Sequence, residues 1–389
     1  MRAVVSGMGA VASIGRDADE VFHSLCAGRT GLAPLRGFDR TRYRARSAYE
    51  IDDRPAEGVD VPGRASTWLA AAVAEAAGQA GLGDDLSEVP VLVGTGLREL
   101  RSLELWWQGQ GELSAEGLHF GPVLRERFGA TDTHTFSNAC SASVYALAVA
   151  SDLLETGQAD TVVVAGVDVL TESMHGLLER VHPVPPERVR PFDRNRTGVL
   201  MGDGAAAVVL RAGESGTSGA RDTPVLGHLR SVGVNCDAYH ATAPDAAGIS
   251  AAMREAHSLA GVKPADIDLV LLHGTGTLLN DEVEATATRD VFAEHASTPR
   301  MTAMKSMTGH TSGASGLMNL VGALQSFAHG LVPPTAGLTD PVDEASSFRM
   351  VTGAAEHADV SVAQINAFGF GGINAVAVVE ADAAGEHTR

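Results

Sequence analysis

The sequence predicts an α/β protein whose sheets are covered by helices on both faces. Three observations indicate this: apolar strands alternate with helical segments, two stretches of the chain resemble each other, and 44% of the 389 residues are hydrophobic. Strands that are apolar along their whole length are typical of sheets enclosed by helices. A chain of this size buries a large core, in two or three domains or in one duplicated fold.

Six short runs rich in valine and leucine predict buried strands. Their β-branched residues fit a pleated, enclosed surface. The expected strands are residues 2–8, 89–96, 161–170, 204–211, 267–276 and 374–380. Alanine-rich stretches between them predict helices at 65–81 and 141–157, the second capped at its end by Gly157.

An internal repeat indicates that the fold is duplicated. Residues 66–97 and 249–277 each contain an alanine-rich helix, an Ala-Gly pair, an acidic linker, a buried strand and a closing Gly-Thr-Gly. Chance similarity between two alanine-rich helix–strand units is the alternative. Under duplication, the break lies in residues 211–224, which are rich in glycine, serine and threonine and lack periodicity. We therefore expect domains at 1–215 and 216–389.

The composition argues against several classes of protein. Three cysteines without paired spacing disfavour a disulfide framework and a cysteine zinc site, and they favour a reducing cytoplasm. The N-terminal segment lacks the apolar stretch of a signal peptide, and no run of about eighteen apolar residues predicts a membrane span. The net charge of −19 argues against nucleic acid as a partner.

Two arginine clusters stand out against this acidic background. Each is either a solvated face or a docking surface for an acidic partner, and the sequence leaves this open. The clusters comprise Arg36, Arg40, Arg42, Arg44 and Arg46, and Arg188, Arg190, Arg194 and Arg196. Within the second cluster, we expect Arg188 or Arg190 to contribute to docking.

The first expected strand carries a Gly7-x-Gly9 pattern that resembles part of a dinucleotide-binding fingerprint. No helix opens directly from these glycines, and no second strand ends in an acidic residue about twenty positions later. We therefore predict a structural tight turn at these glycines and no bound dinucleotide.

Cys140 lies where polar residues lead into an expected helix. Val144, Leu147 and Leu154 share a face of that helix, so Cys140 falls at or just before its N-terminus. The unpaired N–H groups and aligned peptide dipoles there favour a thiolate, the form that attacks acyl groups. A buried structural cysteine is the alternative, and this segment alone does not decide between them.

Two histidines, a lysine and a glycine-rich loop strengthen the nucleophile hypothesis. His273 ends a strongly apolar strand, and Lys305 and His310 precede another helix. Strand ends and helix starts are where ligands collect in α/β folds. Residues 366–379 place three glycines around Phe370, so a backbone N–H there is a candidate oxyanion donor, with a glycine-rich hairpin as the alternative.

Taken together, these segments resemble the β-ketoacyl synthase family, and the resemblance covers nearly the whole chain. No single motif would suffice, but their order and spacing are specific. The motifs are SGMGAVASIG (6–15), NACSAS (138–143), RPFDRNRTGVLMGDGAAAVVL (190–210), DAYHATAP (237–244), HGTGTLLND (273–281), KSMTGHTSGASG (305–316), PPTAGL (333–338) and NAFGFGGINA (366–375). The resemblance implies a thiolase-like fold with two similar βαβαβ halves in a five-layered αβαβα arrangement.

The resemblance also implies catalytic roles. Cys140 would accept the acyl chain as a thioester. His273 and His310 would face a malonyl-type extender and stabilise the enolate left by decarboxylation. Backbone N–H groups of Cys140 and Phe370 would hold the second oxyanion, and Phe370 would also gate the acyl pocket.

Further residues would support the site or bind substrate. Lys305 would orient the network around His310 and form a charge pair with Glu284, and Asp281 would give structural support. The phosphopantetheine arm of an acyl carrier protein would contact Thr275, Thr277 and Gly371. No intrinsic cofactor and no metal is implied. The expected partners are the carrier protein and a second chain, in a homodimer or in a heterodimer with another ketosynthase-like chain.

Three departures from the family pattern bear on specificity. The segments between Gly96 and Cys140 and between Glu179 and Phe192 look shortened, and Ile373 stands where threonine is usual. These changes suggest a stand-alone synthase of secondary metabolism, and they leave the acyl chain length and the dimer geometry open. The His310 position indicates the elongating, two-histidine type, because initiating relatives carry asparagine there.

Condensation on carrier-bound substrates is the leading hypothesis from the sequence. Acyl transfer from Cys140 to an amine or alcohol, and a non-catalytic role beside another synthase, are the alternatives. Retention of Cys140 distinguishes this chain from the silent chain-length partners of aromatic polyketide systems. A cysteine hydrolase needs one base, whereas this chain offers two histidines and a lysine.

Overall fold

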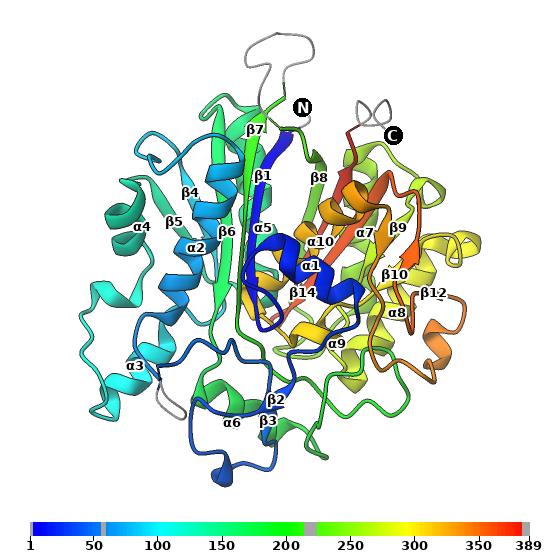
Figure 1. Ribbon diagram of the computed structural model, residues 1–389. Coiled ribbons are helices and arrows are strands. Elements are labelled where there is room, and N and C mark those ends of the chain that lie inside the picture. Colours follow the sequence, from blue (N-terminus) through cyan, green and yellow to red (C-terminus); the bar gives the residue numbers. More distant parts are fainter. Residues whose placement is uncertain (1–2, 56–59, 214–223, 383–389) are drawn as a thin grey trace.

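The computed structural model describes residues 3–55, 60–213 and 224–382. These residues form an eleven-stranded sheet with the strand order β12-β10-β9-β14-β15-β8-β1-β7-β6-β4-β5 (Figure 1). The central strands β1 and β8 pair through Ala3, Val4 and Val5 alone, and this short junction joins two halves of the sheet.

The elements of the described chain have the following bounds. The strands are β1 Ala3–Ala12, β2 Ala33–Pro34, β3 Ser47–Ala48, β4 Val91–Gly94, β5 Thr133–Phe136, β6 Thr161–Asp168, β7 Gly204–Ala212, β8 Gly227–Cys236, β9 Leu269–Leu271, β10 Arg300–Thr302, β11 Leu331–Val332, β12 Arg349–Met350, β13 Glu356–His357, β14 Val362–Gly369 and β15 Ile373–Glu380. The α-helices are α1 Ala18–Cys26, α2 Arg64–Gln79, α3 Leu100–Trp107, α4 Gly121–Phe128, α5 Ala142–Glu155, α6 Glu172–Val181, α7 Ala246–Ala260, α8 Leu278–Phe292, α9 Lys305–Thr308 and α10 Ser315–His329. Two 3₁₀ turns matter for the site: η3 Ala139–Ser141 and η6 Ser312–Ala314.

The two halves of the sheet have the same topology. The first contains β5-β4-β6-β7-β1 and the second β10-β9-β14-β15-β8, so the main strands of each half lie in the chain order third, second, fourth, fifth, first. In both halves the second strand runs parallel to its two neighbours, and the remaining pairings are antiparallel. The repeated segments of the sequence therefore occupy equivalent places, α2–β4 in one half and α7–β9 in the other. The expected boundary at 215/216 and most of the expected connector lie outside the described residues.

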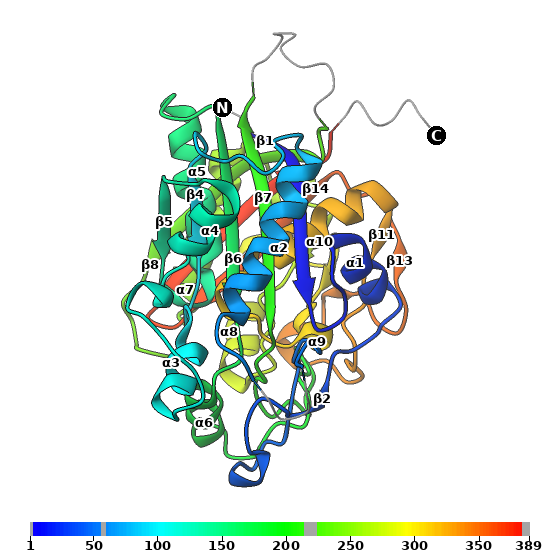
Figure 2. The same ribbon diagram turned by 60° about the vertical axis from the view of Figure 1, so that its left-hand side comes forward.

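Helices α5 and α10 form the centre of the molecule. Both contact strands of both halves, so the two halves of the sheet face each other across this helix pair. The strands divide their side chains accordingly: in β6, Val162 and Val164 join the central core, whereas Val163 and Ala165 join the outer core under α2. Helix α2 covers the outer face of the first half (Figure 2). Helices α7 and α8 cover the second half, which completes the expected five layers.

Gly7 and Gly9 lie inside β1, so the expected tight turn at these positions is wrong. Helix α2 crosses the strand so closely that a Cβ atom on Gly7 would lie 2.1 Å from the carbonyl oxygen of Ala76. A Cβ atom on Gly9 would lie 2.3 Å from that of Ala72. The glycines are therefore required by a helix–strand contact between segments far apart in the sequence.

The expected strands and helices are present with shifted bounds, and Gly157 follows α5 with a φ of +68°. Five strands of the sheet were not predicted from the sequence: β5, β8, β10, β12 and β14. Strand β8 alternates buried and half-exposed residues over most of its length, so it lacks a continuous apolar run. Strand β14 carries Gln364 and Asn366, whose buried amide side chains hydrogen-bond to each other inside the protein.

The surface of the described chain bears on two further expectations. None of its helices is long and apolar enough to cross a membrane. Acidic side chains pair with Arg36, Arg42 and Arg44 of the first arginine cluster. In the second cluster, Arg194 and Arg196 are paired in the same way. Among the described residues no ion pair involves Arg188 or Arg190, which are half-buried.

Gly7→Ala should destabilise the protein by about 1–3 kcal/mol, because the new methyl group overpacks a rigid backbone contact. The free energy of unfolding is measured by urea denaturation. Gly78→Ala is the matched control within α2: a Cβ atom there meets nothing within 4 Å. That control should stabilise the helix by up to about 1 kcal/mol. Equal effects of the two substitutions would contradict the packing explanation.

Candidate active site

Cys140 lies where the two halves of the fold meet. Strand β5 ends at Phe136, η3 carries the cysteine, and α5 begins two residues after it. Ala139 has a φ of +59°, a conformation that residues other than glycine rarely adopt. Gly369, the last residue of β14, packs against this turn, since a Cβ atom there would lie 3.3 Å from Ala139 Cβ. The candidate nucleophile thus precedes a helix, as the sequence predicts.

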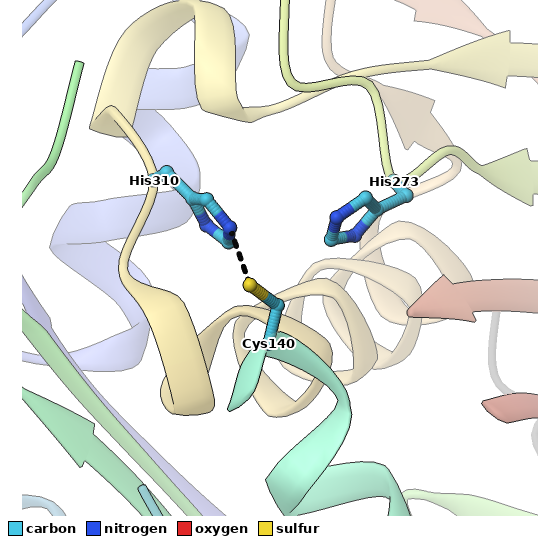
Figure 3. Close-up of side chains that lie close together, drawn as sticks. All are labelled: Cys140, His273 and His310. Atoms are coloured by element: carbon cyan, nitrogen blue, oxygen red, sulfur yellow. Dashed lines mark hydrogen bonds between the residues drawn. The ribbon is translucent and has the colours of Figure 1, made fainter. Parts of the chain in front are cut away.

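His273 and His310 approach the cysteine from the second half. The Nε2 atom of His310 lies 3.0 Å from Cys140 Sγ, and the two imidazole ring centroids are 5.4 Å apart. The sulfur and one ring nitrogen from each histidine all lie within 4.8 Å of one another. Figure 3 shows the two rings on either side of the Cys140 side chain, His273 from the loop after β9 and His310 from the loop after α9. The three residues singled out in the sequence therefore converge.

Hydrogen bonds at the Nδ1 atoms assign the same tautomer to both histidines. The Lys305 ammonium approaches His273 Nδ1 at 3.4 Å, and the Ser312 backbone N–H donates to His310 Nδ1 at 3.2 Å. An Nδ1 atom that accepts a hydrogen bond places the ring proton on Nε2. Burial, together with the charge of Lys305, holds the pKa of both imidazoles well below 6.5, so both are neutral at pH 7. Two neutral Nε2–H donors therefore flank the thiol.

Lys305, which was expected to orient the network around His310, hydrogen-bonds to His273, and its charge lowers the pKa of both imidazoles. Its Nζ donates to the carbonyl oxygen of His273 at 2.5 Å as well as to the ring. The expected charge pair with Glu284 is not a direct contact in the described chain. Glu284 instead accepts hydrogen bonds from the backbone N–H groups of His273 and Gly274, at 2.7 and 2.8 Å. Burial lowers the pKa of Lys305 to about 8, and the negative charge of Glu284 opposes this shift.

Opposing effects act on the pKa of the Cys140 thiol. The charge of Lys305 and the backbone N–H groups of Cys140 and Phe370 lower the pKa of the thiol. Burial and the charge of Asp168 raise it, and burial outweighs the rest, so the pKa is raised to about 11. The helix start was expected to favour a thiolate, and at this position burial opposes that effect. The resting site holds a thiol with N–H donors already placed around it.

The Phe370 loop joins β14 to β15 in a glycine-rich hairpin. The backbone N–H of Phe370 also acts on the Cys140 sulfur, so both expected features are present. Gly371 and Gly372 have φ values of +88° and +74°, which glycine adopts without strain. The Gly371 N–H donates to the carbonyl oxygen of Ala241 at 2.9 Å. Phe370 itself is 48% exposed. The loop is thus held at its base while its aromatic side chain faces outward.

The loop between β9 and α8 holds the remaining expected residues. The hydroxyl oxygens of Thr275 and Thr277 lie 2.9 Å apart, and Thr277 also caps α8. The buried carboxylate of Asp281 accepts hydrogen bonds from the backbone N–H groups of Thr275, Gly276 and Phe192. Asp281 therefore shapes the loop that carries the two hydroxyl groups.

A cysteine and two histidines at this spacing are also a possible metal-ligand set. Coordination through both Nε2 atoms would require the ring protons to move to Nδ1. At Nδ1, however, they would meet the Lys305 ammonium and the Ser312 N–H. The nearby ammonium also repels a cation. These groups favour an oxygen atom that gains negative charge over a metal ion.

Comparison with known proteins identifies the family. Residues 130–215 match the family described as "Beta-ketoacyl synthase, N-terminal domain", and residues 226–339 match its C-terminal domain. The chain is 31% identical to nodulation protein E of Rhizobium meliloti (strain 1021), over 96% of this chain and 98% of that protein. It is 30% identical to the chloroplastic 3-oxoacyl-[acyl-carrier-protein] synthase I of Hordeum vulgare, over 97% and 88%. The chain belongs to the β-ketoacyl synthase family.

Solved structures confirm the thiolase-like fold of this β-ketoacyl synthase. The structure titled "The ishigamide ketosynthase/chain length factor" superposes with a TM-score of 0.88 at 29% identity, covering 98% of this chain and 99% of that one. A β-ketoacyl synthase from Burkholderia phymatum STM815 superposes with a TM-score of 0.83 at 23% identity, with the same coverage. The consequences expected from the two shortened segments and from Ile373 stay predictions.

Three supporting residues were not predicted from the sequence. Ser312 sets the tautomer of His310, and Asn366 donates to Glu284 at 2.9 Å. Asp168, at the end of β6, accepts hydrogen bonds from the Thr95 hydroxyl and from the Gly313 backbone N–H. A lone acid at the end of an apolar strand is a usable signal for Asp168. For the other two the sequence carries no signal, because their roles depend on loops brought together by the fold.

Lys305→Met should slow the alkylation of Cys140 by iodoacetamide. The charge of Lys305 lowers the pKa of the thiol, so its removal raises that pKa further. Each unit of pKa reduces the thiolate fraction about tenfold. The rate is measured at pH 7, where Lys305 with its pKa of about 8 is charged. Mass spectrometry of the Cys140 peptide gives the rate.

The control for this experiment is Lys263→Met, which removes the exposed lysine before η4 and should leave the Cys140 rate unchanged. Cys236 is exposed and reports the reactivity of the reagent in every sample. An unchanged rate at Cys140 in Lys305→Met would contradict the electrostatic role of Lys305.

Proposed function

We propose that this β-ketoacyl synthase catalyses a decarboxylative Claisen condensation in the cytoplasm. An acyl group on Cys140 would react with a malonyl-type extender carried on the phosphopantetheine of an acyl carrier protein. One observation carries the proposal: two neutral Nε2–H donors, from His273 and His310, converge beside one thiol. A paired neutral donor site suits an enolate oxygen, whereas thioester hydrolysis requires a base.

The first step loads the acyl group. Cys140 Sγ attacks the carbonyl carbon of the acyl thioester, and the oxygen gains negative charge. The backbone N–H groups of Cys140 and Phe370, which already act on the sulfur, would stabilise this oxygen. The bond between carbonyl and carrier sulfur then breaks, and the carrier thiol leaves with the proton of the Cys140 thiol. The ammonium of Lys305 lowers the energy of the attacking thiolate.

The second step forms the carbon–carbon bond. The extender's thioester oxygen accepts hydrogen bonds from both Nε2–H groups, the bond to its carboxylate breaks, and carbon dioxide leaves. The electron pair of that bond passes into the enolate, whose negative charge the two donors stabilise. The α-carbon attacks the Cys140 thioester, and Cys140 leaves as a thiolate that takes up a proton from solvent. The product is a β-ketoacyl group on the carrier protein.

Substrate delivery requires no resident cofactor in this proposal. The phosphopantetheine arm, as part of the substrate, would run past the hydroxyl groups of Thr275 and Thr277 and past Gly371. Phe370 would gate the passage between acyl pocket and extender site, which its half-exposed position supports. We also propose a dimer with a second ketosynthase-like chain, identical or not, since β5 is an unpaired edge strand that leads into the nucleophile turn.

Cys140→Ser should abolish condensation between an acyl-carrier protein and a malonyl-carrier protein. The hydroxyl is a far weaker nucleophile than the thiol, so loading of the acyl group fails. Intact mass spectrometry measures the acylated enzyme, and release of carbon dioxide together with product mass measures condensation. Cys236→Ser removes an exposed thiol and should retain both activities.

Two outcomes of that experiment would contradict the proposal. If the wild-type protein acylates Cys140 but releases no carbon dioxide with any malonyl-type extender, acyl transfer to another nucleophile replaces condensation. If Cys140 never becomes acylated, the chain is a non-catalytic partner of another synthase.

Arg190→Glu should weaken turnover with the carrier protein. The backbone nitrogen of Arg190 would lie 3.0 Å from a Cβ atom on Gly276, so this segment flanks the loop of Thr275 and Thr277. No acidic side chain of the described residues pairs with it, and an acidic carrier surface would supply that charge. We expect KM for the carrier protein to rise about fivefold, equivalent to roughly 1 kcal/mol, and to depend less on salt.

The control for the docking experiment is Arg125→Glu, an exposed charge reversal of the same size on the outer helix α4. It should leave KM unchanged. Equal KM values for the wild type and Arg190→Glu, at low salt, would remove Arg190 from the docking surface.

A further inference from the structure

The buried carboxylate of Asp168 joins three segments around the active site. It lies at the end of β6 and is fully buried. Its Oδ1 atom accepts hydrogen bonds from the Thr95 hydroxyl and the Leu97 N–H, both at 2.8 Å. Its Oδ2 atom accepts from the N–H groups of Gly96 and Gly313, both at 2.7 Å. One carboxylate therefore ties the loop after β4 to the turn η6.

The turn η6 carries the donor that orients His310. The Ser312 N–H donates to His310 Nδ1, and the Gly313 N–H, next along the chain, donates to Asp168. Ser312 has a φ of +47°, a strained conformation that persists only where surrounding contacts hold it. The chain of contacts therefore runs from Asp168 through η6 to His310 and on to the sulfur of Cys140.

Close packing restricts the conformation of η6. A Cβ atom on Gly313 would lie 2.5 Å from Thr95 Cα, and one on Gly96 would lie 2.3 Å from Ser312 Oγ. A Cβ atom on Gly166, two residues before Asp168, would lie 2.9 Å from Ala314 Cα. The ends of β4 and β6 thus pack closely against the turn, and the Asp168 carboxylate adds hydrogen bonds to that packing.

We propose that Asp168 is a positioning residue for the condensation: it holds η6 so that the Ser312 N–H keeps the ring proton of His310 on Nε2, directed at the reacting groups. This inference rests on the proposed function, because only a reaction at His310 Nε2 makes that tautomer matter. The hydrogen bonds of the Asp168 carboxylate go to the loop after β4 and to η6, so Asp168 acts on His310 through the turn.

The charge of Asp168 has a second effect that separates positioning from general structural support. It raises the pKa of the Cys140 thiol. A variant that removes the charge should therefore make the thiol more reactive while it makes the histidine site less effective. Loss of fold would also expose the half-buried Cys26, whose thiol pKa burial raises to about 11, so faster alkylation of both cysteines would mark unfolding.

The test uses Asp168→Asn in the full-length protein. The amide keeps the size of the carboxylate but loses its charge, and either orientation turns an NH₂ group toward a backbone N–H of Gly96, Gly313 or Leu97. We expect the alkylation rate of Cys140 by iodoacetamide at pH 7 to rise several-fold, since the thiolate fraction grows about tenfold per unit of pKa. We expect malonyl-carrier protein decarboxylation to fall at least about tenfold, since complete loss of an oxyanion donor costs about 100- to 1,000-fold and here the donor is only misdirected.

Two companion variants complete the test. Asp168→Glu keeps the charge but displaces the turn, so decarboxylation should fall without faster alkylation. Asp203→Asn is the control: this carboxylate is equally buried and its pKa is likewise raised to about 6, but it accepts hydrogen bonds from the backbone N–H groups of Ile51 and Leu170 instead of those of η6. It should lower the melting temperature without accelerating alkylation.

The possible outcomes distinguish the two proposals. A wild-type protein that does not decarboxylate the malonyl extender contradicts the proposed function. A wild type that does so, with decarboxylation retained in Asp168→Asn, overturns the positioning role. Faster alkylation of Cys26 together with Cys140 in Asp168→Asn marks a loss of fold and gives Asp168 a general structural role, which overturns the positioning role as well. Faster alkylation of Cys140 with slower decarboxylation, while Cys26 reacts at the wild-type rate, supports it.

Discussion

The 3.0 Å contact between Cys140 Sγ and His310 Nε2 depends on the packing of the two halves of the molecule. The cysteine belongs to the first half and both histidines to the second, so no site exists in either half alone. The central helices α5 and α10 begin shortly after Cys140 and His310, and each contacts strands of both halves. The large apolar core between the halves therefore fixes the distance between the nucleophile and the donors.

Burial in that core determines which charges the site contains. An isolated buried charge is costly, and neutral groups that donate hydrogen bonds avoid this cost. Both imidazoles are accordingly neutral, and burial raises the pKa of the thiol to about 11. Lys305 is the cation of the site, and the charge of Glu284 favours its protonated form. The histidines consequently offer N–H donors to an oxygen atom that gains negative charge.

The sequence predicted most of the fold and singled out the residues that converge at the candidate site, but it did not predict how they are held. Apolar strands and the helix after Cys140 were visible because their patterns are local. Strand β14 was missed since its buried Gln364 and Asn366 bond to each other, which only the folded sheet reveals. The glycines of β1 were misread because α2, some seventy residues away, approaches them. The resemblance implied that Lys305 orients the network around His310, and the fold also brings its ammonium within 3.4 Å of the His273 ring, 32 residues away in the sequence.

The position of Asp168 illustrates a conflict between two needs of the reaction. Its negative charge opposes thiolate formation at Cys140, and such a carboxylate would be unfavourable if the thiol alone determined the rate. Its hydrogen bonds, however, hold the strained turn at Ser312 and with it the tautomer of His310. Lys305 and the two backbone N–H groups already compensate at the sulfur, whereas the described residues offer His310 Nδ1 no other N–H donor than Ser312. The orientation of the His310 donor is thus the harder requirement, and Asp168 maintains it although its charge raises the pKa of the Cys140 thiol.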